Sequence, residues 1–163
     1  MQATVTDDME LVLRWQENGE NEVRFALAST SEFTITVHLC WERGLNYQGQ
    51  VAITFQTCCY GHDLAEFESQ LRKLAQGSAE SARFLNTGGD FEIRIVPRER
   101  NGRRIMLSEL RYRHYRDIAD VVCDSELMLP VGEAEDVLRS AQAIGEVIRL
   151  LKVDCRNLFE LPQ

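Results

Sequence analysis

The period at which apolar residues recur changes within one short stretch of this chain, at Gly61-His62-Asp63. Over positions 33–41 every second residue is apolar, as in a strand that buries one face: Phe33, Ile35, Val37, Leu39 and Trp41. Positions 51–60 predict a second strand, with Val51, Ile53 and Phe55 facing inward. Beyond the change, the apolar residues fall on one helical face and Gly77 ends the run: Leu64, Phe67, Leu71, Leu74 and Ala75. The sequence therefore predicts two strands followed by a helix over about 63–76.

Strands followed by a helix are predicted again in the second half of the chain. Before the first strand pair, positions 9–15 and 23–27 form a predicted hairpin around the turn-rich residues 18–22. Residues 82–85 are predicted to form a short strand. Residues 91–98 and 103–115 are predicted to form a long hairpin around Asn101-Gly102. A short strand at 125–129 is expected to be broken by Pro130 and Gly132. The closing helix, over about 133–152, has this apolar stripe: Val137, Ala141, Ile144, Ile148 and Leu151.

This order of elements favours an α+β fold rather than a doubly wound one, because few of the strands are separated by helices. We expect one domain over residues 1–163, mainly antiparallel sheet of about seven to eight strands, with two packed helices. Residues 1–28 are interpreted as an N-terminal hairpin added to that domain. Gly145 interrupts the second helix, which predicts a strand packing closely against it.

The composition narrows the classes of function. The chain has 163 residues and a formal net charge of −8, so phosphate would repel it and nucleic acid is a disfavoured partner. Five scattered cysteines, an odd number, indicate reduced thiols and a cytoplasmic location. The N-terminus has no signal-peptide pattern, and no apolar run is long enough for a membrane span.

Chemically versatile residues gather at the period change, in Cys58-Cys59-Tyr60-Gly61-His62-Asp63. A cysteine nucleophile with a histidine base, near Cys58, Tyr60 and His62, is one interpretation. A metal site would need a recognisable spacing of further ligands, which the chain lacks, so we expect no metal and no cofactor. The structural interpretation is favoured. Alternation sends Cys58 and Cys59 to opposite faces with Cys59 in the core, and Asp63 is the expected N-cap, with Glu66 completing a capping box.

Two charge blocks follow each other in the second half. Residues 98–116 hold seven arginines, and the predicted hairpin 91–116 therefore presents a cationic surface that includes Arg111 and Arg113. Residues 117–136 hold seven acidic residues and no Lys or Arg. The acidic segment either neutralises the arginines within the fold or forms a docking surface for a basic protein. The candidate partner-binding residues are Asp117, Asp120, Asp124 and Glu126.

Residues 33–152 resemble the WapI-like group of small bacterial immunity proteins and their uncharacterised relatives. Leu64, Phe67, Leu71, Leu74 and Gly77 match that group's first helix, and Leu129, Glu133 and Leu138 match its closing helix loosely. The resemblance implies a cytoplasmic, non-enzymatic protein that neutralises a cognate toxin by occlusion, often a nuclease with a basic cleft. The sequence therefore favours a protein-binding domain with a basic partner. The alternatives are a regulatory or scaffold domain acting through hairpin 91–116, with weak nucleic-acid contact, and the cysteine enzyme.

Overall fold

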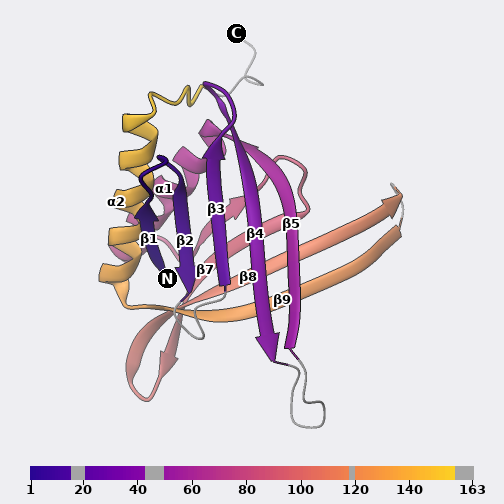
Figure 1. Ribbon diagram of the computed structural model, residues 1–163. Coiled ribbons are helices and arrows are strands. Elements are labelled where there is room, and N and C mark those ends of the chain that lie inside the picture. The colour runs from indigo at the N-terminus through magenta and orange to yellow at the C-terminus, as the bar shows by residue number, and fades with distance from the viewer. Residues whose placement is uncertain (16–20, 43–49, 118–119, 157–163) are drawn as a thin grey trace, which may run out of the picture.

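The chain folds into two antiparallel sheets and two helices (Figure 1). The computed structural model describes residues 1–15, 21–42, 50–117 and 120–156. Within these ranges the first sheet has the order β1-β2-β3-β4-β5, and its strands are Gln2–Val5, Leu11–Trp15, Asn21–Leu27, Glu32–Glu42 and Gln50–Tyr60. The second has the order β6-β7-β8-β9, with strands Ala82–Leu85, Phe91–Arg100, Arg103–Asp117 and Asp120–Gly132. The helices are α1, Gly61–Ala75, and α2, Ala134–Leu150. The predicted single α+β domain is confirmed.

The first sheet continues without interruption from the N-terminal strands into the strands predicted by alternation. β3 pairs with β4 over the register Glu22↔His38 to Leu27↔Phe33, so the N-terminal segment is part of this sheet. Strand β1, which pairs with β2, was not predicted. The expected inward face of β4 is buried at Phe33, Ile35, Val37 and Leu39. The side chains of Trp41 and Val51, and the expected turns at 18–19 and 44–49, lie outside the described residues.

The second sheet contains the predicted long hairpin, and it adds a much longer final strand than expected. Asn101 and Gly102 both have positive φ, 53° and 71°, as a two-residue hairpin turn requires. Strand β9 runs from Asp120 to Gly132, so the prediction that Pro130 and Gly132 break it is wrong. β9 is an edge strand, and the register shifts between Met106 and Leu107, opposite this proline. Proline is tolerated at edges and bulges, because its missing N–H is not needed there.

Both helices begin with an acidic side chain that turns back to the preceding residue. The prediction that Asp63 is the N-cap of this helix, with Glu66 completing a capping box, is wrong. Tyr60 is the N-cap and Asp63 is the third residue of α1, and its Oδ2 accepts a hydrogen bond from the Tyr60 N–H at 2.9 Å. Asp136 holds the same position in α2 and accepts from the Glu133 N–H at 2.8 Å. An acceptor here satisfies a backbone donor at the helix start and places negative charge at the positive end of the helix dipole.

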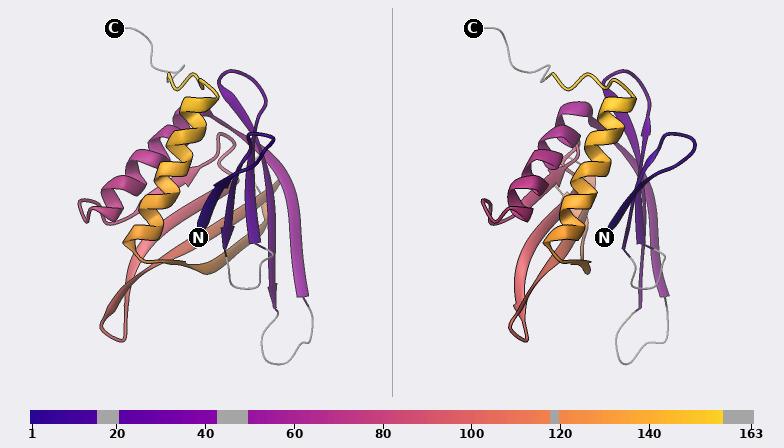
Figure 2. Two further views of the ribbon diagram at one scale, coloured as in Figure 1. Left: turned by 60° about the vertical axis from the view of Figure 1, so that its left-hand side comes forward. Right: turned by 90° about the vertical axis from the view of Figure 1, so that its left-hand side faces the viewer.

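The strands of the second sheet cross those of the first, and the helices pack side by side between the sheets on one side of the molecule (Figures 1 and 2). One apolar core joins all four parts. Phe84 of β6 lies where the two sheets and α1 meet, with its ring 5.5 Å from that of Phe25 in β3 and 5.7 Å from that of Phe67 in α1. Gly145 lies against Glu68 and Arg72 of α1, so the close neighbour of this glycine is a helix and not the expected strand.

Candidate protein-binding surface

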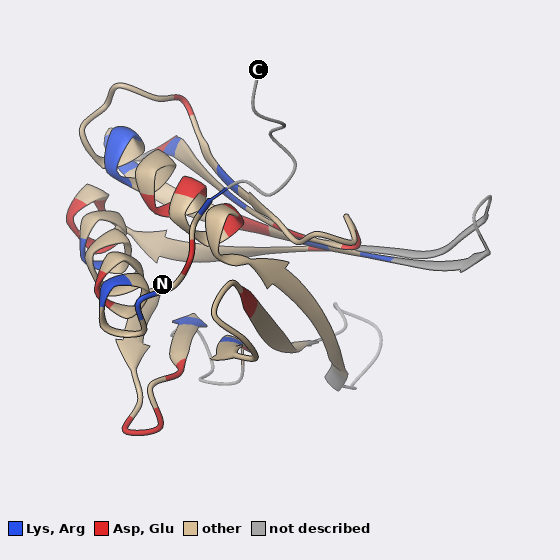
Figure 3. Cartoon of the chain, turned by 90° about the horizontal axis from the view of Figure 1, so that it is seen from above, with Lys and Arg blue, Asp and Glu red and all other residues tan. Residues whose placement is uncertain are grey.

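One face of the second sheet, here called the open face, is turned away from the core. Along β7 and β8 the inward residues Ile93, Ile95 and Leu110 are fully buried, and alternation turns their neighbours outward. The outward residues include Arg94 and Glu109, which are paired in register. Basic and acidic residues are interspersed along these strands (Figure 3). The open face therefore carries charges of both signs.

Ion pairs link neighbouring strands across the open face. Arg83 binds Glu92 at 2.7 Å, and Arg111 binds Glu126 at 3.0 Å. Glu109 lies between two arginines of β7, 3.6 Å from Arg94 and 3.2 Å from Arg98. The arginine side chains are about half exposed, and such pairs contribute only ~0–1 kcal/mol each to stability. They balance charge and hold the side chains in place more than they stabilise the fold.

A large apolar side chain, Met128, lies among these charges with 61% of its surface exposed. It stands opposite Glu109 in the β8–β9 register, and Leu107 of the same face is only half-buried. Among the described residues the other exposed large apolar side chain is that of Leu150, 42% exposed at the end of α2. Arginine and methionine are both enriched in protein interfaces. Met128 was not predicted as a site residue, although its alternation with Leu127 and Leu129 places it on the same face as Glu126.

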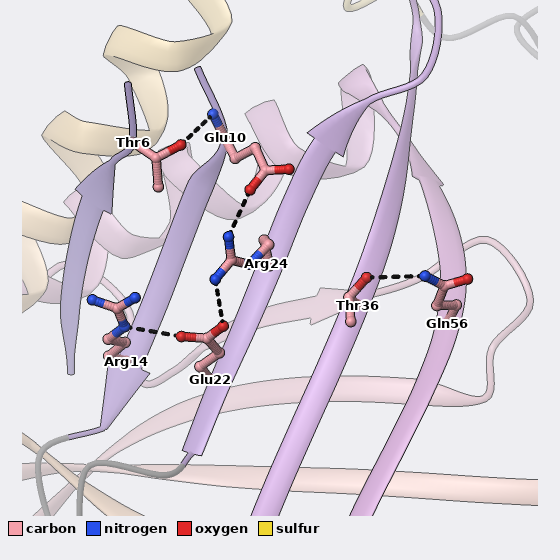
Figure 4. Close-up of polar contacts among 7 residues, drawn as sticks. All are labelled: Thr6, Glu10, Arg14, Glu22, Arg24, Thr36 and Gln56. Atoms are coloured by element: carbon pink, nitrogen blue, oxygen red, sulfur yellow. Dashed lines mark hydrogen bonds and ion pairs between the residues drawn. The ribbon is translucent and has the colours of Figure 1, made fainter. Parts of the chain in front are cut away.

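The outer face of the first sheet provides a contrast (Figure 4). Arg24 binds both Glu10 and Glu22 at 2.8 Å, and Arg14 binds Glu22 at 2.9 Å. Farther along the face, Gln56 donates to Thr36 at 3.4 Å. Partial burial acts to raise the pKa of Glu22, but its hydrogen bonds and ion pairs with Arg24 and Arg14 hold that pKa below its usual value. This face is polar and internally paired, and it has no counterpart of Met128 among the described residues.

The structure places the acidic segment directly beside the arginine-rich strand. In the β8–β9 register Arg111 stands opposite Glu126, Arg113 opposite Asp124, and Asp117 opposite Asp120. The side chains of Asp117, Asp120 and Asp124 lie outside the described residues. The two surfaces proposed as alternatives are thus neighbouring strands of one ribbon, and the Arg111–Glu126 ion pair joins them.

At the period change, Cys58 and Cys59 do take opposite faces, as predicted. Cys59 is fully buried, and burial raises the pKa of its thiol. The pKa of the Cys58 thiol is also raised, first by desolvation and then by the Glu32, Asp90 and Asp63 carboxylates. A nucleophilic cysteine needs the opposite shift, because the thiolate is the reactive form.

His62 lies beside both Tyr60 and Asp63. The rings of His62 and Tyr60 stack with centroids 5.7 Å apart, and His62 Nε2 is 3.1 Å from Asp63 Oδ1. Across the part of the chain that the structure covers, no group of three or more His, Cys, Asp or Glu side chains could hold a metal ion. No helix within it is long and apolar enough to cross a membrane.

No family model, curated protein or solved structure matches this chain.

Proposed function

We propose that this chain is a non-enzymatic protein-binding domain that neutralises a cognate toxin by covering the toxin's functional surface. The open face of the second sheet is its docking surface. The observation that carries the proposal is Met128, exposed on a strand between charged neighbours. Water is a poor environment for this side chain, and a partner that covered it would gain the free energy of its burial.

The chemistry of the partner follows from charge. The net charge of −8 and the acidic residues Asp117, Asp120, Asp124 and Glu126 favour a basic protein. The resemblance to WapI-like immunity proteins supports the same partner, a toxin whose substrate cleft is basic. Charge would then accelerate association, while burial of Met128 would slow dissociation.

Two other functions are less well supported. A scaffold or nucleic-acid-binding role for hairpin 91–116 would use Arg111 and Arg113, but Arg111 already binds Glu126, and Glu109 already binds Arg94 and Arg98. A phosphate would have to compete with these carboxylates. A cysteine enzyme at Cys58 would need a thiolate, which desolvation and then the neighbouring acids disfavour.

The test uses the purified product of the gene adjacent to the one that encodes this chain, the place where a cognate toxin is expected. Wild-type protein should bind it, and Met128→Glu should weaken binding 10–100-fold, about 1.4–2.8 kcal/mol. Reversing Asp117, Asp120 and Asp124 to Lys should slow association and reduce its dependence on salt. Thr36→Glu, on the outer face of the first sheet, is the matched control and should change Kd less than threefold. Absence of binding, or equal affinity of the Met128→Glu variant, would contradict the proposal.

A further inference from the structure

Strand β5 is an edge of the first sheet, and among the described residues no strand pairs with its free side. It runs for 11 residues, Gln50–Tyr60, with no charged residue, no proline and an unbroken register against β4. The other edges are protected: β1 and β6 have four residues each, and β9 has Pro130, register shifts and several acids. Proteins ordinarily shorten, bend or charge a free edge, because its unpaired backbone groups pair with any extended strand.

The free backbone groups of β5 can be identified. The Cys58 carbonyl accepts a hydrogen bond from Thr87 N–H at 3.3 Å, so it points away from β4. Since alternate residues of an antiparallel strand direct their N–H and C=O to the same side, Ala52, Thr54 and Gln56 point away from β4 as well. No described residue forms a hydrogen bond with these outward backbone groups. Three consecutive outward positions therefore present both a donor and an acceptor.

An apolar surface lies beneath this edge. Ile53 and Phe55 are only half-buried, whereas Leu39 and Val37, opposite them on β4, are buried. The Phe55 ring stacks on that of Tyr112 in β8, with centroids 4.0 Å apart. From Tyr112, β8 continues to Asp117, about 16 Å farther, and Figure 1 shows β8 and β9 passing beyond β5. A strand added beside β5, ~5 Å away, would lie over this extension.

Charge distinguishes the two ends of the edge. The carboxylates of Glu32, Asp90 and Asp63 all act on the Cys58 thiol near the end of β5. In the described part of the chain none of them forms an ion pair with a lysine or arginine, and Asp63 pairs only with His62. A positive charge would be favoured at this end, while the rest of the strand is uncharged.

We propose that β5 binds an extended segment of a partner protein as an additional strand. The segment alternates apolar residues, which face the surface at Phe55 and Tyr112, with polar ones. It has a Lys or Arg at the end that lies nearest the Glu32, Asp90 and Asp63 carboxylates. A second copy of this chain fits less well, because β8 and β9 extend into the space that its first sheet and core would occupy. The edge shares no residue with the open face around Met128, so occupancy of the two surfaces can be measured separately.

The probe is a random dodecapeptide library displayed on phage and selected on the full chain. Selected peptides should alternate apolar and polar residues, contain a basic residue at one end, and slow hydrogen exchange at the Ala52, Thr54 and Gln56 amides.

Variants of the protein test the edge itself. Thr54→Pro removes an outward N–H without removing a β4 hydrogen bond, and it should weaken binding of the synthesised peptides at least tenfold. Thr54→Val keeps the N–H and is the matched control, with a Kd within threefold of wild type. Glu32→Gln should weaken peptides with a basic end about threefold.

A second measurement leaves the protein unchanged. N-methylation of alternate peptide amides should abolish binding in one register of methylation and spare it in the other, because only one set of amides faces β5. Equal binding of both methylated forms, or protection at residues outside β5, would overturn the proposal. So would a wild-type dimer that Thr54→Pro converts to a monomer, since the occupant would then be a second copy. A library that yields no binding peptide would also overturn it. None of these outcomes depends on whether a toxin binds at Met128.

Discussion

Asn86 shows how single residues hold the junction between the two sheets. It is 2% exposed, and its Nδ2 donates to Thr57 of β5 at 2.6 Å and also to Asp90. Its Oδ1 accepts a hydrogen bond from the Phe91 N–H at 2.8 Å. One side-chain amide therefore connects β5 to the turn before β7, and both its donor and its acceptor atoms are used.

Replacement of Asn86 by Asp should be destabilising in a pH-dependent way. The variant puts a second carboxylate against Asp90, and it should lose about 1.5–3 kcal/mol of unfolding free energy at pH 7. Like charges raise the folded-state pKa of the pair above its unfolded value, so protonation favours the folded state and stability returns as pH falls toward 4. Urea unfolding at pH 7 and pH 4.5 measures the effect.

The exchanged variant Asn86→Asp/Asp90→Asn is the control, because it restores one amide and one carboxylate at the same place. It should recover most of the loss at pH 7. A single variant that is equally destabilised at both pH values would show that geometry, and not charge, makes Asn86 necessary.

Predictions for single residues are confirmed where the strand period of two alone decides which face a side chain takes. Alternation alone puts Cys59 in the core and Cys58 on the other face, and it does so without knowledge of any neighbour. Asn86 was not predicted, because its partners Thr57 and Phe91 come from different strands. The N-cap was misplaced because Asp63 serves a helix start equally well at its third position.

At the scale of elements, the start of α2 depends on Asp136. Its hydrogen bond from the Glu133 N–H, together with the nearby Arg139, lowers the pKa of this carboxyl below its usual value of 3.8. A lowered folded-state pKa means that the stabilisation is complete above the unfolded-state pKa and is lost as pH falls through the folded-state value.

Asp136→Asn should therefore cost about 0.5–1 kcal/mol at pH 7, and the difference from wild type should shrink as pH falls through the lowered folded-state pKa of Asp136. Glu135→Gln is the control, since Glu135 is in the same first turn but exposed, and it should cost less at every pH. Chemical denaturation from pH 2.5 to 7 compares the three proteins. A constant difference between Asp136→Asn and wild type across this range would contradict the assigned role of the charge.

The sequence predicts the end of a strand where turn residues end it, and it does not where pairing with a neighbouring strand extends it. Asn101-Gly102 marks its turn in the sequence, because positive φ at two consecutive residues restricts the choice. β9 extends through Pro130 because β8 supplies a partner over nearly its whole length. β1 has four residues and too short a pattern to detect, and it depends on β2 for its ladder.

At the scale of the whole molecule, the sequence predicted one mainly antiparallel domain but not its division into two crossing sheets. The sequence does predict that β5 leads into α1. The division also requires knowing that β5 does not pair with β6, and the spacing of apolar residues does not say which strands pair. The division creates the four sheet edges, of which β5 is long and uncharged, and the two outward faces, of which one carries Met128. Met128 and the β5 edge become candidate binding positions only through sheet pairing, which explains why the sequence alone does not predict them.

Phe84 allows a test of whether the two sheets unfold together. The ring packs against Phe25 and Phe67, so Phe84→Ala removes contacts between both sheets and α1 and should cost about 3–5 kcal/mol. Both tryptophans, Trp15 and Trp41, lie in the first sheet, so their fluorescence reports that sheet, while far-UV circular dichroism reports all elements. If the two sheets share one cooperative core, the two signals should shift to the same lower urea midpoint.

The control is Leu85→Ala, at the half-buried next position of β6, and it should shift the urea midpoint much less. In Phe84→Ala, unchanged tryptophan fluorescence with a shifted dichroism midpoint would mean that the first sheet folds without the second.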